Sequence, residues 1–266
     1  MQAPAKAAKA RLSSVANSIR LLTSFSGEED ELAITALAHR LGLAKSTVHR
    51  LAATLAAAGF LEQNSDNGRY RLGVALFELG ALVRRRMDVA NEARPHLREL
   101  LEKTGETVQL GIVDHYSVLY VYEMESRHAI RMAAAVGARA PLHCTAVGKV
   151  LLAFQDADYA REALARGLTA FTPKTVTRRD AVLAMLEEVR RHEYAVDDEE
   201  SEEGLRAIAA PVRNHNGLVI AALGVAAPVQ RMSKREMQTA VPVVMATARA
   251  VSARLGYQQA RRRAAG

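Results

Sequence analysis

Residues 41–61 read LGLAKSTVHRLAATLAAAGFL, and this stretch decides the fold of the N-terminal part of the chain. Gly42 is a natural end for one short helix, and the polar run after it begins a second helix, from about Lys45 to Ala58. Gly59 favours a stop, because glycine readily adopts the left-handed conformation that closes a helix. The stretch therefore predicts a short helix, a tight turn and a longer helix.

The segment upstream adds another helix. Ser13 or Ser14 can cap a helix that runs to about Phe25, because a serine hydroxyl accepts hydrogen bonds from the free N–H groups of the first turn. Thr35 can cap the short helix that Gly42 ends in the same way. Three helices are therefore expected, two that end before or at Gly42 and one that begins at Lys45.

A hairpin follows the third helix. Residues 60–63 and 69–72 read as two short strands, and they enclose a polar turn that contains Asn67-Gly68. An Asn-Gly dipeptide between two such strands is a strong hairpin signal. The order helix, helix, turn, helix, hairpin predicts a winged helix-turn-helix domain over residues 13–73.

The helix that begins at Lys45 has two different faces when its residues are placed at about 100° intervals. The apolar face, which should pack on the other helices, comprises Val48, Leu51, Ala52 and Leu55. The opposite side is small, polar and basic, which suits a DNA major groove about 12 Å wide. The residues expected to contact DNA are Lys45, Ser46, Thr47, His49 and Arg50 on this helix, with Arg69 and Arg71 on the wing. An ordinary solvated helix face is the alternative interpretation.

The charge distribution favours DNA. Residues 1–86 hold 12 Lys and Arg against 7 Asp and Glu, whereas residues 87–266 hold 24 against 22. A basic module joined to a nearly neutral domain is typical of a protein with an anionic partner. A non-specific architectural DNA-binding protein is disfavoured, because the larger part of the chain would then have no purpose.

Several classes of protein are disfavoured by the rest of the composition. Hydrophobic residues make up 49% of the 266 residues, enough for a real core, but there is no Trp and only 5% aromatic residues, which argues against aromatic-lined carbohydrate sites. The single cysteine, Cys144, excludes an intrachain disulfide and fits a reducing compartment. No apolar run approaches the roughly 18 residues of a membrane span, and residues 1–14 lack a signal-peptide core. We expect a cytoplasmic protein.

The remainder of the chain mixes helices and strands. Helices are expected at 72–86, 89–103 (broken locally at Pro95), 145–154, 178–192 and 233–257, and strands at 107–114, 118–124, 128–136, 193–198, 205–212 and 218–226. This mixture predicts an α+β domain with an antiparallel sheet covered by helices. The expected division is a flexible basic arm (1–12), the winged helix-turn-helix domain (13–73), a linker helix (74–88), an effector-binding domain (89–258) and a basic tail (259–266).

Three stretches together resemble the IclR family of bacterial transcription regulators. They are Leu41–Leu51 followed by Gly59–Leu61, PLHCTAVGKVLLA at 141–153, and DDEE at 197–200 followed by GLRAIAAPV at 204–212. The first occurs in many winged helices, but the three in this order and spacing are specific, and the resemblance runs from Ser14 to about Tyr257. It implies a winged N-terminal domain, a linker helix and a GAF-like effector-binding domain, without a cofactor.

The resemblance also implies partners and an effector site. It implies homodimers, often paired into tetramers, on double-stranded operators with palindromic or repeated half-sites. The effector is expected against one face of the sheet, under the start of the helix near Thr145. The residues that the family pattern places around it are Met132, Leu142, His143, Thr145, Ala146, Val147, Asp197, Ala207, Gly224 and Ala226.

The chain departs from the family where the ligand would bind. A cysteine is common in the family at the position of Ala207, and members that bind small keto acids tend to have hydroxyls at Gly224 and Ala226. Fewer donors and more room suggest a larger, more apolar effector, such as an aromatic acid or a related catabolic intermediate. The helix that begins near Thr145 offers free N–H groups to a carboxylate.

Some roles stay open at this point. His143 is either a core histidine or a ligand contact. Asp197 would repel an anion, so it either binds a hydroxyl or amine or hydrogen-bonds the backbone. The acidic run 197–203 is expected to be a solvated loop rather than a metal site. The chain is expected to repress a catabolic operon, with activation as the alternative.

An enzyme is the rival class. Cys144 beside His143, with Asp197 elsewhere, would be the nucleophile, base and orienting group of a hydrolase. Adjacent residues on one segment rarely face each other well, and one cysteine with scattered histidines lacks the ligand spacing of a zinc site. The sequence therefore predicts a regulator rather than an enzyme.

Overall fold

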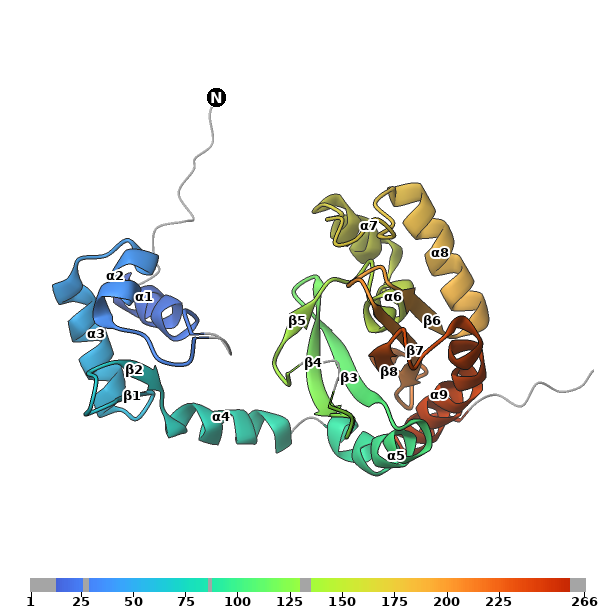
Figure 1. Cartoon of the computed structure of the whole chain (residues 1–266), viewed down its shortest axis with the longest axis horizontal. Coiled ribbons are helices and arrows are strands. Elements are labelled where there is room, and N and C mark those ends of the chain that lie inside the picture. Colours follow the sequence, from blue (N-terminus) through green and yellow to red (C-terminus); the bar gives the residue numbers. More distant parts are fainter. Residues whose placement is uncertain (1–12, 26–28, 86–87, 130–134, 259–266) are drawn as a thin grey trace, which may run out of the picture. The chain divides into compact units, whose positions relative to one another are not determined.

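The computed structural model describes residues 13–25, 29–85, 88–129 and 135–258. The chain divides into two compact units, Met1–Arg86 and Met87–Gly266, called here the N-terminal and C-terminal units (Figure 1). The basic arm at 1–12 and the basic tail at 259–266 lie outside the described residues. Within the described ranges, no helix has the length and apolar content needed to span a bilayer.

The N-terminal unit is a winged helix-turn-helix. Its elements are α1 (Ser13–Leu22), α2 (Ile34–Leu41), α3 (Lys45–Ala57), β1 (Leu61–Gln63), β2 (Tyr70–Leu72) and α4 (Val74–Arg85). The two strands pair antiparallel. The small core is built from Leu21, Leu32, Leu37, Ala38, Leu41, Val48, Ala52, Leu61 and Tyr70. Gly42 and Gly59 have φ values of 66° and 74°, so the predicted helix stops are confirmed.

Two predicted helix limits in this unit are wrong. α2 begins at Ile34 with Ala33 as its cap, so Thr35 lies inside the helix and caps nothing. The cause is tertiary, because Leu32 exchanges both backbone hydrogen bonds with Tyr70 of the wing and so fixes where the chain turns into α2. α1 ends at Leu22 rather than Phe25, where the hydroxyls of Thr23 and Ser24 donate to carbonyls of its last turn.

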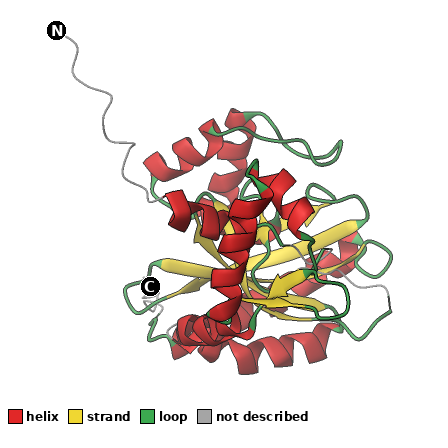
Figure 2. Ribbon diagram, turned by 90° about the vertical axis from the view of Figure 1, so that its left-hand side faces the viewer, coloured by secondary structure: helices red, strands yellow, loops and turns green. Residues whose placement is uncertain are grey.

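The C-terminal unit contains a six-stranded antiparallel sheet in the order β5-β4-β3-β8-β7-β6 (Figure 2). The strands are β3 (Thr107–Asp114), β4 (Ser117–Met124), β5 (Arg139–Ala140), β6 (Ala195–Asp198), β7 (Leu205–Arg213) and β8 (Val219–Pro228). The helices are α5 (Asp88–Thr104), α6 (Ala146–Ala153), α7 (Ala157–Ala165), α8 (Arg179–His192) and α9 (Lys234–Arg254). The α+β class is therefore as predicted.

Helices cover both faces of this sheet (Figure 1). On one face, α5 and α9 pack on alternate strand residues such as Leu110, Ile208 and Leu223. On the other face, α6 packs with α7 and α8 against Ala209 and Ala222. The period of two along β7 and β8 divides their residues between the two cores. The second face carries the site described below.

Three sequence expectations for this unit need correction. Pro95 does not break α5, although proline cannot donate the usual backbone hydrogen bond. Pro95 lies on the exposed side of the helix, and Ala93, Leu97 and Leu100 on the opposite side are buried in the core. The predicted strand at 128–136 is not found at its described residues, and 130–134 lie outside them; the short β5 pairs with β4 instead. The helix α7 was not predicted, although Asp156 caps it by accepting from the Tyr159 N–H at 2.7 Å.

Candidate functional site

The predicted DNA-contacting side of α3 is exposed in the N-terminal unit. Lys45, Ser46, Thr47, His49 and Arg50 are all exposed, while Val48 and Ala52 are buried. No hydrogen bond or ion pair joins the Lys45 or Arg50 side chain to another residue of the described ranges. The helix therefore has two cations available to an anionic partner.

The start of α3 is also open to an anion. Ala44 precedes the helix in an extended conformation and supplies no capping side chain. The Thr47 and Val48 N–H groups donate to the Ala44 carbonyl, at 3.0 and 3.1 Å, whereas the Lys45 and Ser46 N–H groups before them have no helical acceptor. Such an end attracts phosphate, and Lys45 lies beside it.

The two wing arginines differ in how free they are. Arg71 lies in β2 opposite Glu62 and pairs with it at 2.9 Å, with Glu31 at 3.9 Å. Arg69 precedes β2, is exposed, and has no ion pair to a described residue. Arg69 is therefore the more available wing cation. The hairpin register around Asn67-Gly68 could have revealed the Arg71–Glu62 pair.

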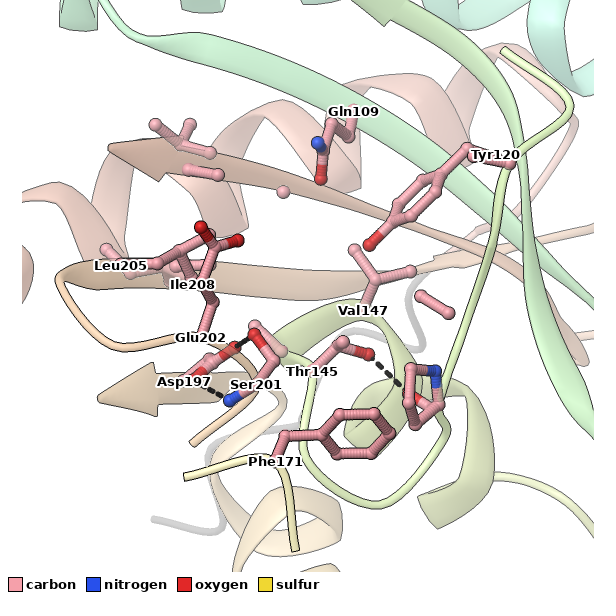
Figure 3. A pocket seen from close by; sticks show the side chains of 18 of the residues that line it. Gln109, Tyr120, Thr145, Val147, Phe171, Asp197, Ser201, Glu202, Leu205 and Ile208 are labelled. Carbon is pink, nitrogen blue, oxygen red and sulfur yellow. Dashed lines mark hydrogen bonds between the residues drawn. The ribbon is translucent and has the colours of Figure 1, made fainter. Parts of the chain in front are cut away.

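The C-terminal unit has a pocket of about 290 Å³ between the sheet and the start of α6 (Figure 3). Of the predicted effector residues, it is lined by Thr145, Ala146, Val147, Asp197, Ala207, Gly224 and Ala226. The register explains why strands far apart in sequence meet here, since Asp197 is opposite Ala207 and Ala207 is opposite Ala226. Residues that the sequence did not single out also line it, among them Gln109, Tyr120, Arg139, Phe171, Ser201, Glu202 and Leu205.

Three of the predicted residues are not in this pocket as described. Leu142 and His143 line a neighbouring pocket. Met132 lies outside the described residues. The residues that the family pattern placed together therefore line two pockets rather than one.

The start of α6 offers two N–H groups to the pocket. Thr145 caps the helix: its hydroxyl oxygen accepts from the Gly148 N–H at 3.0 Å and donates to the Pro141 carbonyl at 2.7 Å. The N–H groups of Ala146 and Val147 belong to the first turn and have no acceptor within the described ranges. Together with the helix dipole, they form a site for a carboxylate.

Two buried polar side chains face the same space. Gln109 on β3 and Tyr120 on β4 are each 6% exposed, and neither has a hydrogen-bond partner in the described part of the chain. Figure 3 shows the Gln109 amide and the Tyr120 hydroxyl turned into the pocket, with the Phe171 ring on its other side. Burial, followed by the nearby Asp197 charge, raises the pKa of Tyr120, so its hydroxyl stays protonated. A ligand can supply the missing partners.

The Asp197 carboxylate accepts hydrogen bonds from the loop that follows it. Its Oδ1 accepts from the Glu200 and Ser201 N–H groups at 2.7 and 3.2 Å, and its Oδ2 accepts from the Ser201 hydroxyl. These bonds correspond to the backbone-bonding role that the sequence left open. Burial raises the pKa of Asp197 despite them.

A buried ion pair fixes the same loop to α6. The Lys149 side chain is 2% exposed, and its Nζ donates to Glu200 and, at 2.8 Å, to the Val196 carbonyl. Burial raises the pKa of Glu200, which the Lys149 charge opposes. Sequence reasoning missed this pair, because Lys149 reads as a solvated residue of an otherwise apolar helix.

The acidic run 197–203 is not simply a solvated loop, which corrects the sequence expectation. Asp198 pairs with Arg206 at 2.5 Å, and Glu199 pairs with Lys174 at 2.5 Å. The cation that pairs with Asp198 comes from the neighbouring strand β7, and the cation that pairs with Glu199 comes from a segment 25 residues away. Over the described ranges, no group of three or more His, Cys, Asp or Glu residues could hold a metal ion.

The geometry does not support a hydrolase. Cys144 is fully buried, and burial raises its pKa to about 12, which keeps it a thiol. The His143 Nε2 lies 3.0 Å from the Thr169 carbonyl, so its hydrogen bond goes to the backbone and not to a nucleophile. Cys144 and His143 are therefore not arranged as the nucleophile and base of a hydrolase.

Comparisons with known proteins agree with this geometry. Residues 14–65 match the IclR helix-turn-helix domain, and residues 81–253 match the bacterial transcriptional regulator IclR C-terminal domain. The transcriptional regulator KdgR of Escherichia coli is 40% identical over 87% of this chain and 88% of its own. The transcriptional repressor AllR of the same species is 34% identical over 82% and 81%.

A solved structure is also similar. An IclR homologue from Microbacterium hydrocarbonoxydans, complexed with 4-hydroxybenzoate, superposes with a TM-score of 0.82 at 28% identity and covers 91% of this chain and 98% of its own. Both the helix-turn-helix and the C-terminal domain are thus shared with regulators that bind DNA. The chain belongs to the IclR family of bacterial transcription regulators.

Proposed function

We propose that this DNA-binding regulator represses a catabolic operon until an organic acid fills the pocket of the C-terminal unit. It binds double-stranded operator DNA with palindromic or repeated half-sites as a homodimer or a dimer of dimers. The observation that carries the DNA part is the exposed side of α3, from Lys45 to Arg50, beside an uncapped helix start. The repressor AllR, at 34% identity, supports the sign of regulation.

Replacing Arg50 by alanine is expected to weaken specific operator binding by about 1–3 kcal/mol, which is roughly 5- to 150-fold. The reason is that Arg50 is an exposed cation without a described partner, so its charge is available to a base edge or a phosphate. The measurement is a gel-shift titration on the intergenic fragment upstream of the regulated gene. A reporter from that promoter should rise in the variant if the protein represses.

The matched control is Arg235→Ala, an exposed arginine on α9 of the C-terminal unit, which should leave operator affinity unchanged. Unchanged affinity of the Arg50 variant would remove α3 as the recognition helix. A fall in reporter activity in the variant would instead identify an activator.

The effector that we propose is an aromatic acid that carries a hydroxyl. Its carboxylate accepts from the Ala146 and Val147 N–H groups, its ring lies against Val147 and Phe171, and its hydroxyl meets Gln109 or Tyr120. The proposal that the effector carries a hydroxyl rests on Gln109 and Tyr120, whose side chains have no hydrogen-bond partner in the described part of the chain. The proposal that the effector is aromatic is supported by the similar structure that was solved with 4-hydroxybenzoate.

Calorimetric titration with 4-hydroxybenzoate, benzoate, gluconate and pyruvate tests this effector class. We expect 4-hydroxybenzoate to bind roughly three- to tenfold tighter than benzoate, since benzoate leaves the buried Gln109 and Tyr120 groups unpaired. Gln109→Leu should reduce that preference. Tight binding of pyruvate without any aromatic acid, or of gluconate in preference to both aromatic acids, would contradict the proposal.

A further inference from the structure

A second pocket lies next to the effector pocket in the C-terminal unit. It has a volume of about 200 Å³, and Pro141 and Phe171 line both pockets. Its walls are mostly apolar and are contributed by α6, α7 and the segments that flank them; they include Leu142, Leu152, Ala163, Leu164 and Leu168. We call it the side pocket. The proposed effector does not use it.

His143 contributes a hydrogen-bonding group to the mostly apolar side pocket. The residue is 7% exposed, and its Nε2 lies 3.0 Å from the Thr169 carbonyl, so Nε2 carries the hydrogen and donates. The second ring nitrogen, Nδ1, is then a lone-pair acceptor, and no donor meets it within the described ranges. Burial lowers the pKa of His143, which keeps the ring neutral near pH 7.

The rim of the side pocket does not attract an anion. Its one cation, Arg166, lies with Cζ 3.8 Å from the centre of the Tyr116 ring and pairs with Glu162 at 3.2 Å. This charge is already compensated, and the remaining lining side chains are uncharged. The lining therefore favours a neutral molecule over a carboxylate.

We propose that the side pocket is an accessory binding site for a neutral, phenol-sized molecule whose hydroxyl donates to His143 Nδ1 and whose ring packs against the leucines of α6 and α7. The molecule fills an apolar space and supplies a donor to an acceptor that has no partner in the described ranges, two features typical of small-molecule sites. This site is separate from the proposed effector pocket and does not depend on the effector class.

The test is calorimetric titration of the full-length protein with phenol, with toluene as the ligand that lacks the hydroxyl. Saturable phenol binding with one site per chain is expected, roughly three- to tenfold tighter than toluene because of the hydrogen bond. Equal affinities for the two ligands, or no saturable phenol binding, would overturn the proposal.

Three variants locate the site. Ala163→Phe fills the side pocket and should weaken phenol binding at least tenfold, whereas Ala207→Leu fills the effector pocket and should leave it unchanged. His143→Leu removes the Nδ1 acceptor together with the donor to the Thr169 carbonyl, so phenol should weaken to the affinity of toluene. Loss of phenol binding in Ala207→Leu alone would place phenol in the effector pocket and reject the side pocket.

A further measurement guards against a variant that does not fold. In the wild-type protein, phenol should shift the methyl NMR signals of Leu152 and Leu164, which line only the side pocket. The signal of Ala207, which lines only the effector pocket, should stay in place. Shifts confined to Ala207 would contradict the assignment. Titration of 4-hydroxybenzoate into the phenol-saturated protein, followed by the Ala207 signal, then tests the proposed effector independently of the side pocket.

Discussion

Replacing Lys149 by methionine is expected to destabilise the C-terminal unit by about 3–5 kcal/mol, because the change leaves the buried Glu200 carboxylate without its cation. The two side chains are 2% and 13% exposed, and the Val196 carbonyl also loses its donor. Asp197, which is buried nearby, adds a second negative charge. Urea unfolding of the wild-type and variant proteins, followed by circular dichroism, measures the loss.

An exposed pair provides the matched control. Lys103 and Glu99 lie 2.7 Å apart on α5, with side chains 56% and 59% exposed. Lys103→Met should leave the free energy of unfolding close to its wild-type value, because water solvates the remaining carboxylate. Equal decreases in the free energy of unfolding for Lys149→Met and Lys103→Met would contradict the prediction that the buried carboxylate of Glu200 makes the Lys149 change more destabilising.

The loss at Lys149 should also depend on pH. Burial raises the folded-state pKa of Glu200 above its unfolded value, and removal of the cation raises it further. A carboxyl with a raised folded pKa contributes stability that is present at low pH and is lost as pH rises through that pKa. The difference between wild type and variant should therefore be larger at pH 8 than at pH 5. The double variant with Glu200→Gln should recover part of the loss at pH 8.

Replacing Gly73 by alanine is expected to destabilise the N-terminal unit by about 3 kcal/mol or more, because the new methyl group has no space. A Cβ at this position would lie 2.1 Å from the Gly59 carbonyl oxygen and 3.0 Å from the Leu61 nitrogen, both rigid backbone atoms. The Gly73 N–H also donates to the Phe60 carbonyl at 2.9 Å. The wing and α4 must shift away from α3 to relieve the contact.

Operator binding should fall at least tenfold in this variant, while calorimetric binding of the effector to the C-terminal unit stays unchanged. Gly80→Ala on α4 is the control, since a Cβ there meets no atom within 4 Å. In an exposed helix this change should stabilise by about 0.5–1 kcal/mol. Unaltered operator binding by the Gly73 variant would mean that the wing is not required in its present position.

Local patterns in the chain predicted several elements well. The helix α3 begins at Lys45 and buries Val48 and Ala52, as its two-faced pattern indicated. The hairpin β1–β2 formed around the predicted Asn67-Gly68 turn. These features depend on side-chain periodicity and on turn chemistry within a few residues, which the sequence expresses directly.

The candidate site was only partly predictable. Family motifs placed Thr145, Asp197 and Ala207 together, and the structure has them around one pocket. Gln109 and Tyr120 were missed, although their strands were predicted correctly. Alternation along a strand shows that two faces differ, but it does not show which face α6 covers.

Sequence alone thus determined the helix-turn-helix, the wing, the antiparallel strand pairs and the basic character of the α3 surface, because each depends on neighbours in the chain. Only the tertiary structure decided that Lys149 is buried against Glu200, that Arg71 is held by Glu62, and that His143 belongs to the side pocket. Those outcomes depend on contacts between segments far apart in sequence, whose burial and charge compensation arise only when the sheet and its helices pack together.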